Sequence, residues 1–172
     1  MATAAVGIGG GAMRALYIVR HGIALPHDTP DVADDDRPLT PEGEARTREV
    51  AHGLKTLKVR VDAIATSPLP RARRTAEIVA EVLGLMDVLE DADILRAGNE
   101  AEVIAEWLAT RGEASLMVVG HNPGVSDLVG LLLGNAGSIG ELRRAGVAAL
   151  VDEGSGWRLD WLARPRLLRG LS

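Results

Sequence analysis

Three apolar runs in this sequence end in residues that can bind or transfer a phosphoryl group. The first run leads into "RHG" (20–22), the second into "TSP" (66–68) and the third into "GHNP" (120–123), while Arg71 follows the second run closely. Guanidinium groups bind phosphoryl oxygens in pairs, and a neutral imidazole can attack phosphorus or donate a hydrogen bond. These residue types together predict an anion site in which phosphate is the natural ligand.

The elements that carry these motifs predict an α/β fold. Short apolar runs without polar alternation are typical of buried parallel strands, and amphipathic stretches between them are typical of helices. The predicted strands are 14–20, 61–67, 86–90 and 114–120, and the predicted helices are 39–57, 70–83, 99–111 and 123–134. This order favours a single domain with a mostly parallel sheet and helices on both faces, and it brings His21 and His121 to the same carboxyl edge.

The remaining segments complete the predicted organisation. Residues 146–153 and 156–164 are two further strands, read as a hairpin around "EGSG" (153–156). The small, Gly-rich segment 1–12 is expected to be a flexible tail before a domain that covers 13–172. The acidic, Pro-containing stretch 23–38 is a long loop that leaves the same sheet edge, and loops of this length are often functional.

Composition excludes several classes of function. The sequence has no cysteine, so no thiolate nucleophile and no disulfide framework exist, and a cytoplasmic location is the default expectation. A net charge of −5 and an aromatic content of 2% argue against nucleic acid as a partner. No apolar run approaches the ~20 residues that a membrane span requires, so no membrane partner is expected.

Other histidines and arginines have simpler explanations. Arg73 and Arg74 lie one helical turn before Glu77, so surface ion pairs account for them. His27 and His52 are expected to be structural. A metal site built on His27 and the aspartates of 28–36, or a binuclear metallophosphoesterase suggested by "GHNP", has no specific ligand spacing, so neither a metal nor a cofactor is expected.

These motifs resemble those of the histidine phosphatase superfamily. "VRHG" is similar to its Arg-His-Gly signature, "SPLPRARRTAE" (67–77) to its Ser-Pro-x-x-Arg-Ala segment, and "VVGHNPG" to its Gly-His strand end. "DRPLTPEG" (36–43) and the closing "WLARPRLL" (161–168) are similar to one branch, the SixA-type phosphohistidine phosphatases. The resemblance extends from residue 14 over nearly the whole chain, and implies a phosphoglycerate mutase-like fold.

The resemblance also implies roles for individual residues. His21 would be the nucleophile that becomes phosphorylated, with Arg20, Arg71 and His121 completing the catalytic pocket. The substrate-binding candidates are Arg20, Arg37, Arg71, His121, Gly22 and Asn122. The family needs no metal and no cofactor. We expect Arg37 to face the site while Asp34 and Asp35 stay in solvent.

The general acid is left open by the sequence. Many members of the superfamily carry an acid after the third strand, and here the candidates in that region are Glu90, Asp91, Asp93 and Glu100. A sugar or glycerate alkoxide leaves poorly without such an acid, whereas the nitrogen of a phosphoramidate leaves readily. A site without an obvious acid therefore favours phosphohistidine in a protein as the substrate. A small-molecule phosphomonoesterase with a phosphorylated metabolite as substrate is the alternative, and a non-catalytic phosphate-binding module is a further one.

Overall fold

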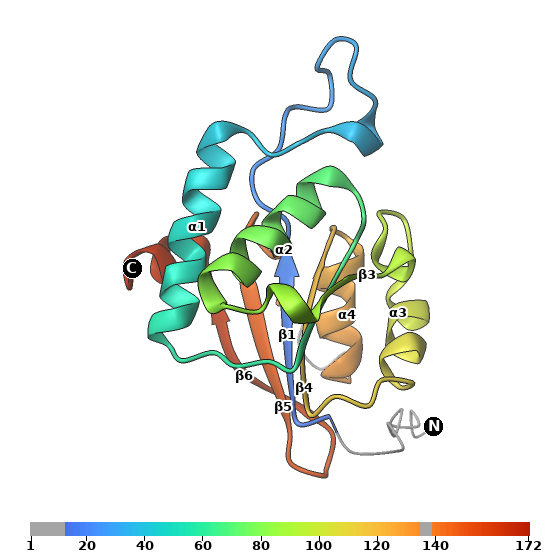
Figure 1. The fold of residues 1–172 in the computed structure, drawn as a ribbon. Coiled ribbons are helices and arrows are strands. Elements are labelled where there is room, and N and C mark those ends of the chain that lie inside the picture. Colours follow the sequence, from blue (N-terminus) through green and yellow to red (C-terminus); the bar gives the residue numbers. More distant parts are fainter. Residues whose placement is uncertain (1–12, 135–138) are drawn as a thin grey trace.

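A six-stranded sheet lies at the centre of the computed structural model, which describes residues 13–134 and 139–172 (Figure 1). Its strand order is β3-β2-β4-β1-β5-β6. The strands are β1 (Ala15–Arg20), β2 (Ala63–Thr66), β3 (Leu89–Asp91), β4 (Ser115–Gly120), β5 (Val147–Asp152) and β6 (Trp157–Ala163). The pairs among β3, β2, β4 and β1 are parallel, and β1–β5 and β5–β6 are antiparallel. The predicted α/β fold with a mostly parallel sheet is confirmed, while the predicted tail 1–12 lies outside the described residues.

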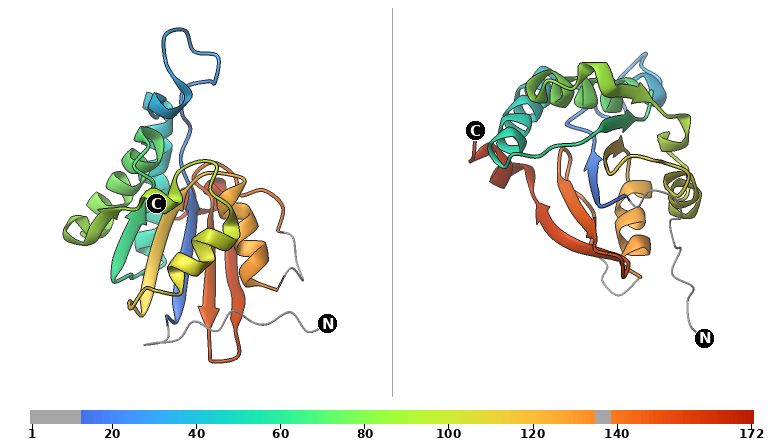
Figure 2. Two further views of the ribbon diagram at one scale, coloured as in Figure 1. Left: turned by 90° about the vertical axis from the view of Figure 1, so that its right-hand side faces the viewer. Right: turned by 60° about the horizontal axis from the view of Figure 1, so that its bottom comes forward.

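Helices cover both faces of the sheet (Figure 2). One face packs against α1 (Pro41–Thr56), α2 (Pro70–Leu83) and the short α5 (Pro165–Arg169), and the other against α3 (Ala101–Leu108) and α4 (Gly124–Leu132). Each face has its own cluster of buried apolar side chains. β1 and β4 are therefore buried on both sides, which explains why their sequences are continuously apolar rather than alternating.

Helix boundaries follow local signals in the sequence. Thr40 accepts a hydrogen bond from the backbone nitrogen of Gly43 at 2.9 Å, so it caps α1, and Pro41 occupies the first helical position. Gly84 ends α2 with a φ of 72°, a left-handed conformation that glycine adopts without steric cost. These two helices begin and end within two residues of their predicted bounds.

Two segments differ from the sequence prediction. Residues 86–90, predicted as a strand, form a 3-10 turn (Met86–Val88) before the three-residue β3. The helix α5 was not predicted, since five residues are too short to show helical periodicity. It docks on α1 at Gly53, where a Cβ atom would lie 2.1 Å from the carbonyl oxygen of Leu168. This close backbone approach depends on tertiary packing.

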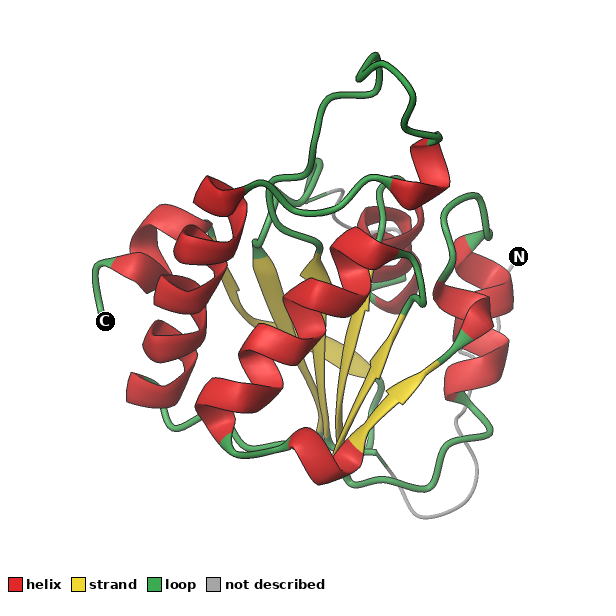
Figure 3. Cartoon of the chain, turned by 45° about the horizontal axis from the view of Figure 1, so that its top comes forward, coloured by secondary structure: helices red, strands yellow, loops and turns green. Residues whose placement is uncertain are grey.

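The carboxyl ends of β1, β2 and β4 meet at one edge of the sheet (Figure 3). The loop 23–38 leaves this edge, projects beyond it and contains a 3-10 turn at Asp34–Asp36. No helix within the described ranges is long and apolar enough to cross a membrane.

Candidate active site

The two motif histidines lie side by side at the carboxyl edge of the sheet. β1 and β4 are adjacent and parallel, with Arg20 opposite Gly120, so the residue that follows each strand is a histidine. The ring centroids of His21 and His121 are 5.2 Å apart, and the side chains are 8% and 5% exposed. The prediction that the two rings lie at the same edge of the sheet is confirmed, and their joint contact with one phosphoryl group stays a prediction.

His21 is held as a neutral imidazole with one nitrogen free. Its Nδ1 lies 2.7 Å from the carbonyl oxygen of Gly22, which can only accept, so Nδ1 carries the proton and Nε2 keeps its lone pair. Burial lowers the pKa of His21 to about 3. The hydrogen bond to Gly22 opposes this shift, and the nearby charges of His121, Arg71 and Arg20 reinforce it. The ring is therefore uncharged near neutral pH, as a nucleophile must be.

Arg20 and Arg71 are anchored by backbone carbonyls. Arg20 donates from Nη1 to the carbonyl oxygen of Leu142 at 2.9 Å, and Arg71 donates from Nη1 to that of Asp34 at 2.8 Å. The Nε atom of each guanidinium is buried and has no partner among the residues that the structure describes. Both arginines thus retain a donor for a ligand.

His121 contributes a third buried nitrogen without a partner. Its Nε2 lies 2.7 Å from the hydroxyl oxygen of Ser67, while its Nδ1 is buried and has no hydrogen-bond partner within the described ranges. Burial lowers its pKa to about 3, and the charge of Arg71 acts in the same direction. Buried polar atoms of this kind are rarely left unsatisfied in a working protein, so the site is suited to an anionic ligand with several acceptors.

Gly22 has a packing role in addition to the bond with His21. Its backbone nitrogen donates to the hydroxyl oxygen of Thr75 at 2.9 Å, and this hydroxyl donates to the carbonyl oxygen of Arg71 at 2.7 Å. A Cβ atom on Gly22 would lie 2.4 Å from Oγ1 of Thr47. The glycine therefore lets β1 turn tightly against α1, and its amide is already used.

The loop 23–38 is tied to the site through Asp34. Its carboxylate accepts a hydrogen bond from Nε of Arg37 at 2.8 Å and lies 3.8 Å from Nη2 of Arg71. Asp34 is exposed, as expected, with a side chain that is half accessible, but the sequence did not predict that Arg37 and Arg71 would attract its carboxylate. His27, which we expected to be structural, also contacts Asp34, at 2.5 Å.

Arg37 lines the cleft beside His21 but has partners on all sides. It is 6% exposed and, besides Asp34, donates to the carbonyl oxygen of Leu25 at 2.6 Å and lies 3.4 Å from Nε2 of His27. The cleft has a volume of about 410 Å³, and the lining includes Arg20, His21, His27, Arg37, Glu42 and Arg144. Direct binding of substrate by Arg37 stays a prediction.

Asn122 serves the scaffold of the site. Its amide donates to the carbonyl oxygen of Leu142 at 3.1 Å, the same oxygen that binds Arg20, and accepts from the hydroxyl of Ser126 at 2.5 Å. Sequence reasoning missed Leu142 and Ser126 because neither is part of a motif with a chemical signature. Ser67 and Thr75 are part of the motif "SPLPRARRTAE" (67–77), but the sequence assigned no role to either.

The four candidate acids after β2 are engaged elsewhere or exposed. Glu90 pairs with Arg111 at 2.5 Å, Asp91 with Arg73 at 2.8 Å and Asp93 with Arg96 at 2.9 Å, while Glu100 lies exposed before α3. Within the described part of the chain, none of the four forms an ion pair or hydrogen bond with His21.

Arg73 and Arg74 both pair with Glu77, which confirms them as helix-surface arginines. In the described part of the chain, no three His, Asp or Glu side chains are placed to hold a metal ion.

Comparisons with known proteins agree with this geometry. The model of the histidine phosphatase superfamily (branch 1) matches residues 16–96. Phosphohistidine phosphatase SixA of Escherichia coli (strain K12) is 30% identical over 154 residues, which cover 87% of this chain and 93% of that protein. The structure of the protein histidine phosphatase SixA complexed with tungstate is similar with a TM-score of 0.78 and 29% identity, covering 90% of this chain and 99% of the other.

The fold is shared more widely than the sequence. A phosphoglycerate mutase from Bacillus anthracis str. Sterne is similar with a TM-score of 0.70 at 18% identity, covering 92% of this chain and 96% of the other, which shows the fold alone. In this chain two histidines and two arginines lie at the carboxyl edge of such a sheet, an arrangement suited to a tetrahedral anion. The chain belongs to the histidine phosphatase superfamily, and its similarity to SixA supports phosphatase activity.

Proposed function

We propose that this protein hydrolyses phosphohistidine in a phosphorylated protein, through a phosphorylated His21. The observation that carries the proposal is the neutral His21, whose Nε2 has no hydrogen-bond partner among the described residues, beside three buried nitrogens that have none there either. SixA, whose name describes the same activity, was crystallised with tungstate, a tetrahedral oxyanion shaped like phosphate.

In the first step, Nε2 of His21 attacks phosphorus. A nitrogen–phosphorus bond forms at His21 while the bond between phosphorus and the substrate nitrogen breaks, and the departing imidazole takes up a proton from solvent. The Nε–H groups of Arg20 and Arg71 neutralise the phosphoryl oxygens, which carry the charge in the transition state. These donors are fixed by backbone carbonyls before substrate arrives, so little reorganisation is needed.

In the second step, water attacks the phosphorylated His21. The bond between Nε2 and phosphorus breaks, inorganic phosphate leaves, and His21 returns to its neutral form. The hydrogen bond from Nδ1 to Gly22 persists throughout, so the same nitrogen is presented in each cycle. Splitting one displacement into two is the general benefit of a covalent intermediate.

The surroundings of the site support a nitrogen leaving group. Asp34 pairs with Arg37, and its carboxylate lies 3.8 Å from Nη2 of Arg71. Burial acts to raise its pKa, but the hydrogen bond and charge of Arg37 prevail and hold the pKa below its ordinary value. An ionised carboxylate cannot donate a proton. A phosphoramidate needs no such donor, whereas an alkoxide does.

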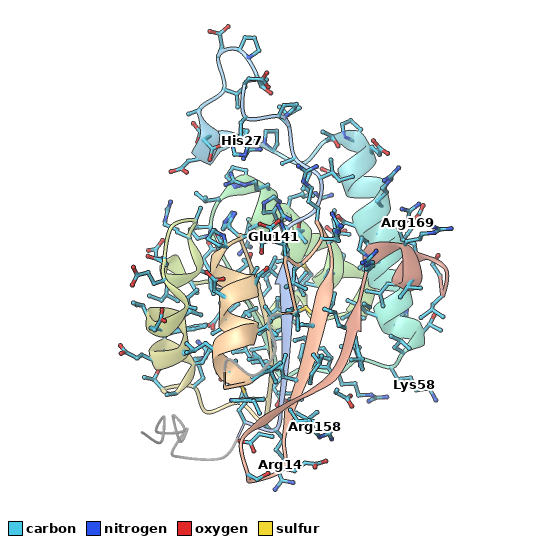
Figure 4. The ribbon with its side chains drawn as sticks, turned by 180° about the vertical axis from the view of Figure 1, so that it is seen from behind. Arg14, His27, Lys58, Glu141, Arg158 and Arg169 are labelled. Atoms are coloured by element: carbon cyan, nitrogen blue, oxygen red, sulfur yellow. The ribbon has the colours of Figure 1, made fainter. Side chains whose placement is uncertain are left out.

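Glu141 supports a second candidate, a small-molecule phosphomonoesterase. Its charge acts on Arg20, and it lies at the same end of the molecule as His27, far from Arg14 and Arg158 (Figure 4). It is exposed, so a substrate could bring it within reach of a leaving oxygen. In that case Glu141→Gln would slow ester hydrolysis and leave phosphoramidate hydrolysis unchanged.

Trapping the intermediate tests the proposal. A brief incubation with a phosphohistidine protein, quenched in alkali, should leave one phosphate per chain that is labile to acid and stable to base. His21→Ala should abolish this adduct but keep phosphate binding, since both arginines remain. His121→Ala should slow turnover by roughly 10²–10³ and still form the adduct. His52→Gln, on the exposed side of α1, is the matched control.

A substrate panel separates the two candidates. We expect the phosphohistidine protein to be hydrolysed with a higher kcat/KM than phosphate esters of sugars, glycerate and serine. A preference for one of the esters would support the phosphomonoesterase instead. An adduct that persists in His21→Ala and is lost in His121→Ala would reverse the roles of the two histidines.

The absence of cysteine supports the cytoplasm as the place of action.

A further inference from the structure

Ser67 is a fully buried serine whose hydroxyl contacts the ring of His121. It follows β2 and is 0% exposed. Its Oγ lies 2.7 Å from Nε2 of His121 and 3.2 Å from the backbone nitrogen of Leu69. The slower turnover expected of His121→Ala assumes that His121 donates to the phosphoryl group, but it does not decide which nitrogen of the ring carries the proton.

The donors and acceptors around the Ser67 hydroxyl determine which nitrogen of His121 carries the proton. The amide of Leu69 can only donate, so it occupies a lone pair of the Ser67 oxygen. The hydrogen of the Ser67 hydroxyl then needs an acceptor, and Nε2 of His121 is the partner the structure provides among the described residues. Nε2 must therefore be unprotonated, which places the proton of a neutral ring on Nδ1.

The opposite arrangement leaves the Ser67 hydroxyl hydrogen unsatisfied and puts a lone pair on Nδ1 of His121. If Nε2–H donated to Ser67, the serine hydrogen would have no acceptor among the described residues, and the 0% exposure of Ser67 keeps solvent from supplying one. Nδ1 of His121 would then hold a lone pair. That atom is buried and has no partner in the described ranges, and the centroid of its ring is 5.2 Å from that of His21. A lone pair there would repel a phosphoryl oxygen, whereas an N–H group would bind it.

We propose that Ser67 is a positioning residue: its hydroxyl donates to Nε2 of His121 and keeps the imidazole in the tautomer whose Nδ1–H binds the phosphoryl group. This inference rests on the proposed function of the site, but the tautomer itself can be observed without turnover. Ser67 acts only through His121. The carbonyl oxygen of Gly22 has the same role for His21. It accepts from Nδ1 of that ring and so leaves Nε2 unprotonated as the nucleophile.

Nitrogen–proton NMR of the imidazole rings tests the tautomer in the resting protein. The chain has four histidines, so single His→Gln variants assign each ring. At about pH 7, His121 should show a protonated Nδ1 and an unprotonated Nε2. The groups that act on this ring are Arg71, Arg37, Arg20, Asp34 and the ring of His21. A protonated Nε2, alone or in a doubly protonated ring, would overturn the proposal even if the protein proved to be a phosphatase.

Variants of Ser67 test the consequence for catalysis. Ser67→Ala should lower kcat for phosphoramidate about 10–100-fold, as loss of an outer hydrogen-bond partner of a functional histidine does, while KM changes less than about threefold. Ser67→Thr keeps the hydroxyl and should restore most of kcat. Ser155→Ala, in the exposed hairpin turn, is the control.

These outcomes separate a positioning role from a structural one. Wild-type kcat in Ser67→Ala, or equal loss in the Ala and Thr variants, would refute the inference. In Ser67→Ala the nitrogen spectrum of His121 should lose its single-tautomer pattern, and an unchanged spectrum would also refute it. A complete lack of phosphatase activity in the wild type would instead refute the proposed function, and the resting-state spectrum would still decide the role of Ser67.

Discussion

Lowering the pH from 7 to 5 should weaken folding through His21 and His121. Burial lowers the pKa of each ring to about 3, whereas an unfolded histidine has a pKa near 6.5. Between these values the folded protein keeps both rings neutral while the unfolded chain binds protons. The stabilisation is therefore fully present above about pH 6.5 and is lost progressively as the pH falls towards 3.

The size of the effect follows from the same pKa values. For one group with pKa 6.5 unfolded and about 3 folded, protonation of the unfolded chain costs about 0.2 kcal/mol of stability at pH 7 and about 2 kcal/mol at pH 5. The two rings together should therefore account for about 4 kcal/mol of lost unfolding free energy over this range. That loss is a large fraction of the ~5–15 kcal/mol that holds a typical domain together.

Urea denaturation at a series of pH values measures this loss. The buffers must be free of phosphate and sulfate, since an anion that binds the site would stabilise the folded state by mass action. Titrating carboxylates contribute to any pH dependence, so the comparison is between variants. His21→Gln and His121→Gln should each remove about 2 kcal/mol of the difference between pH 7 and pH 5. His52→Gln, at an exposed position on α1, should keep the wild-type dependence.

A wild-type protein and a His21→Gln variant with parallel pH profiles would refute the reasoning. That result would mean that His21 is as easily protonated in the folded protein as in the unfolded chain. It would also remove the physical basis for a neutral nucleophile near pH 7. If only His52→Gln removed the difference in unfolding free energy between pH 7 and pH 5, the exposed His52 would be the source of the pH dependence.

Three further predictions concern the site and its scaffold. Gly22→Ala should destabilise the fold by about 1–3 kcal/mol in urea denaturation, because the new Cβ would meet Oγ1 of Thr47 at 2.4 Å; wild-type stability would mean that this contact relaxes freely. Arg37→Ala should weaken vanadate binding by about 1.5–3 kcal/mol, the scale of a hydrogen bond to a charged group, and an unchanged affinity would confine Arg37 to holding Asp34 and Leu25. Phosphatase activity should survive exhaustive treatment with EDTA, and activity restored by a divalent cation would contradict the metal-free mechanism.

The sequence by itself determined which residues meet. β1 and β4 are continuously apolar, a pattern typical of parallel strands buried on both faces, and parallel strands present their carboxyl ends to one edge. That topology was sufficient to bring His21 and His121 together and to place Arg71 beside them. The bounds of α2 were equally local, since Pro70 and Gly84 mark its ends through their own backbone preferences.

Only the tertiary structure decided how these residues behave. The partner of His121 is Ser67, 54 positions away, and the partner of Gly22 is Thr75, 53 positions away. The carboxylate of Asp34 is half exposed, and the sequence of its loop gives no sign that it lies 3.8 Å from Nη2 of Arg71. Hydrogen-bond geometry and burial depend on distances of a few ångströms between separate elements, and no spacing along the chain encodes them. Protonation states and tautomers follow from those distances, so the sequence supplied the reactive groups and the packing set their chemistry.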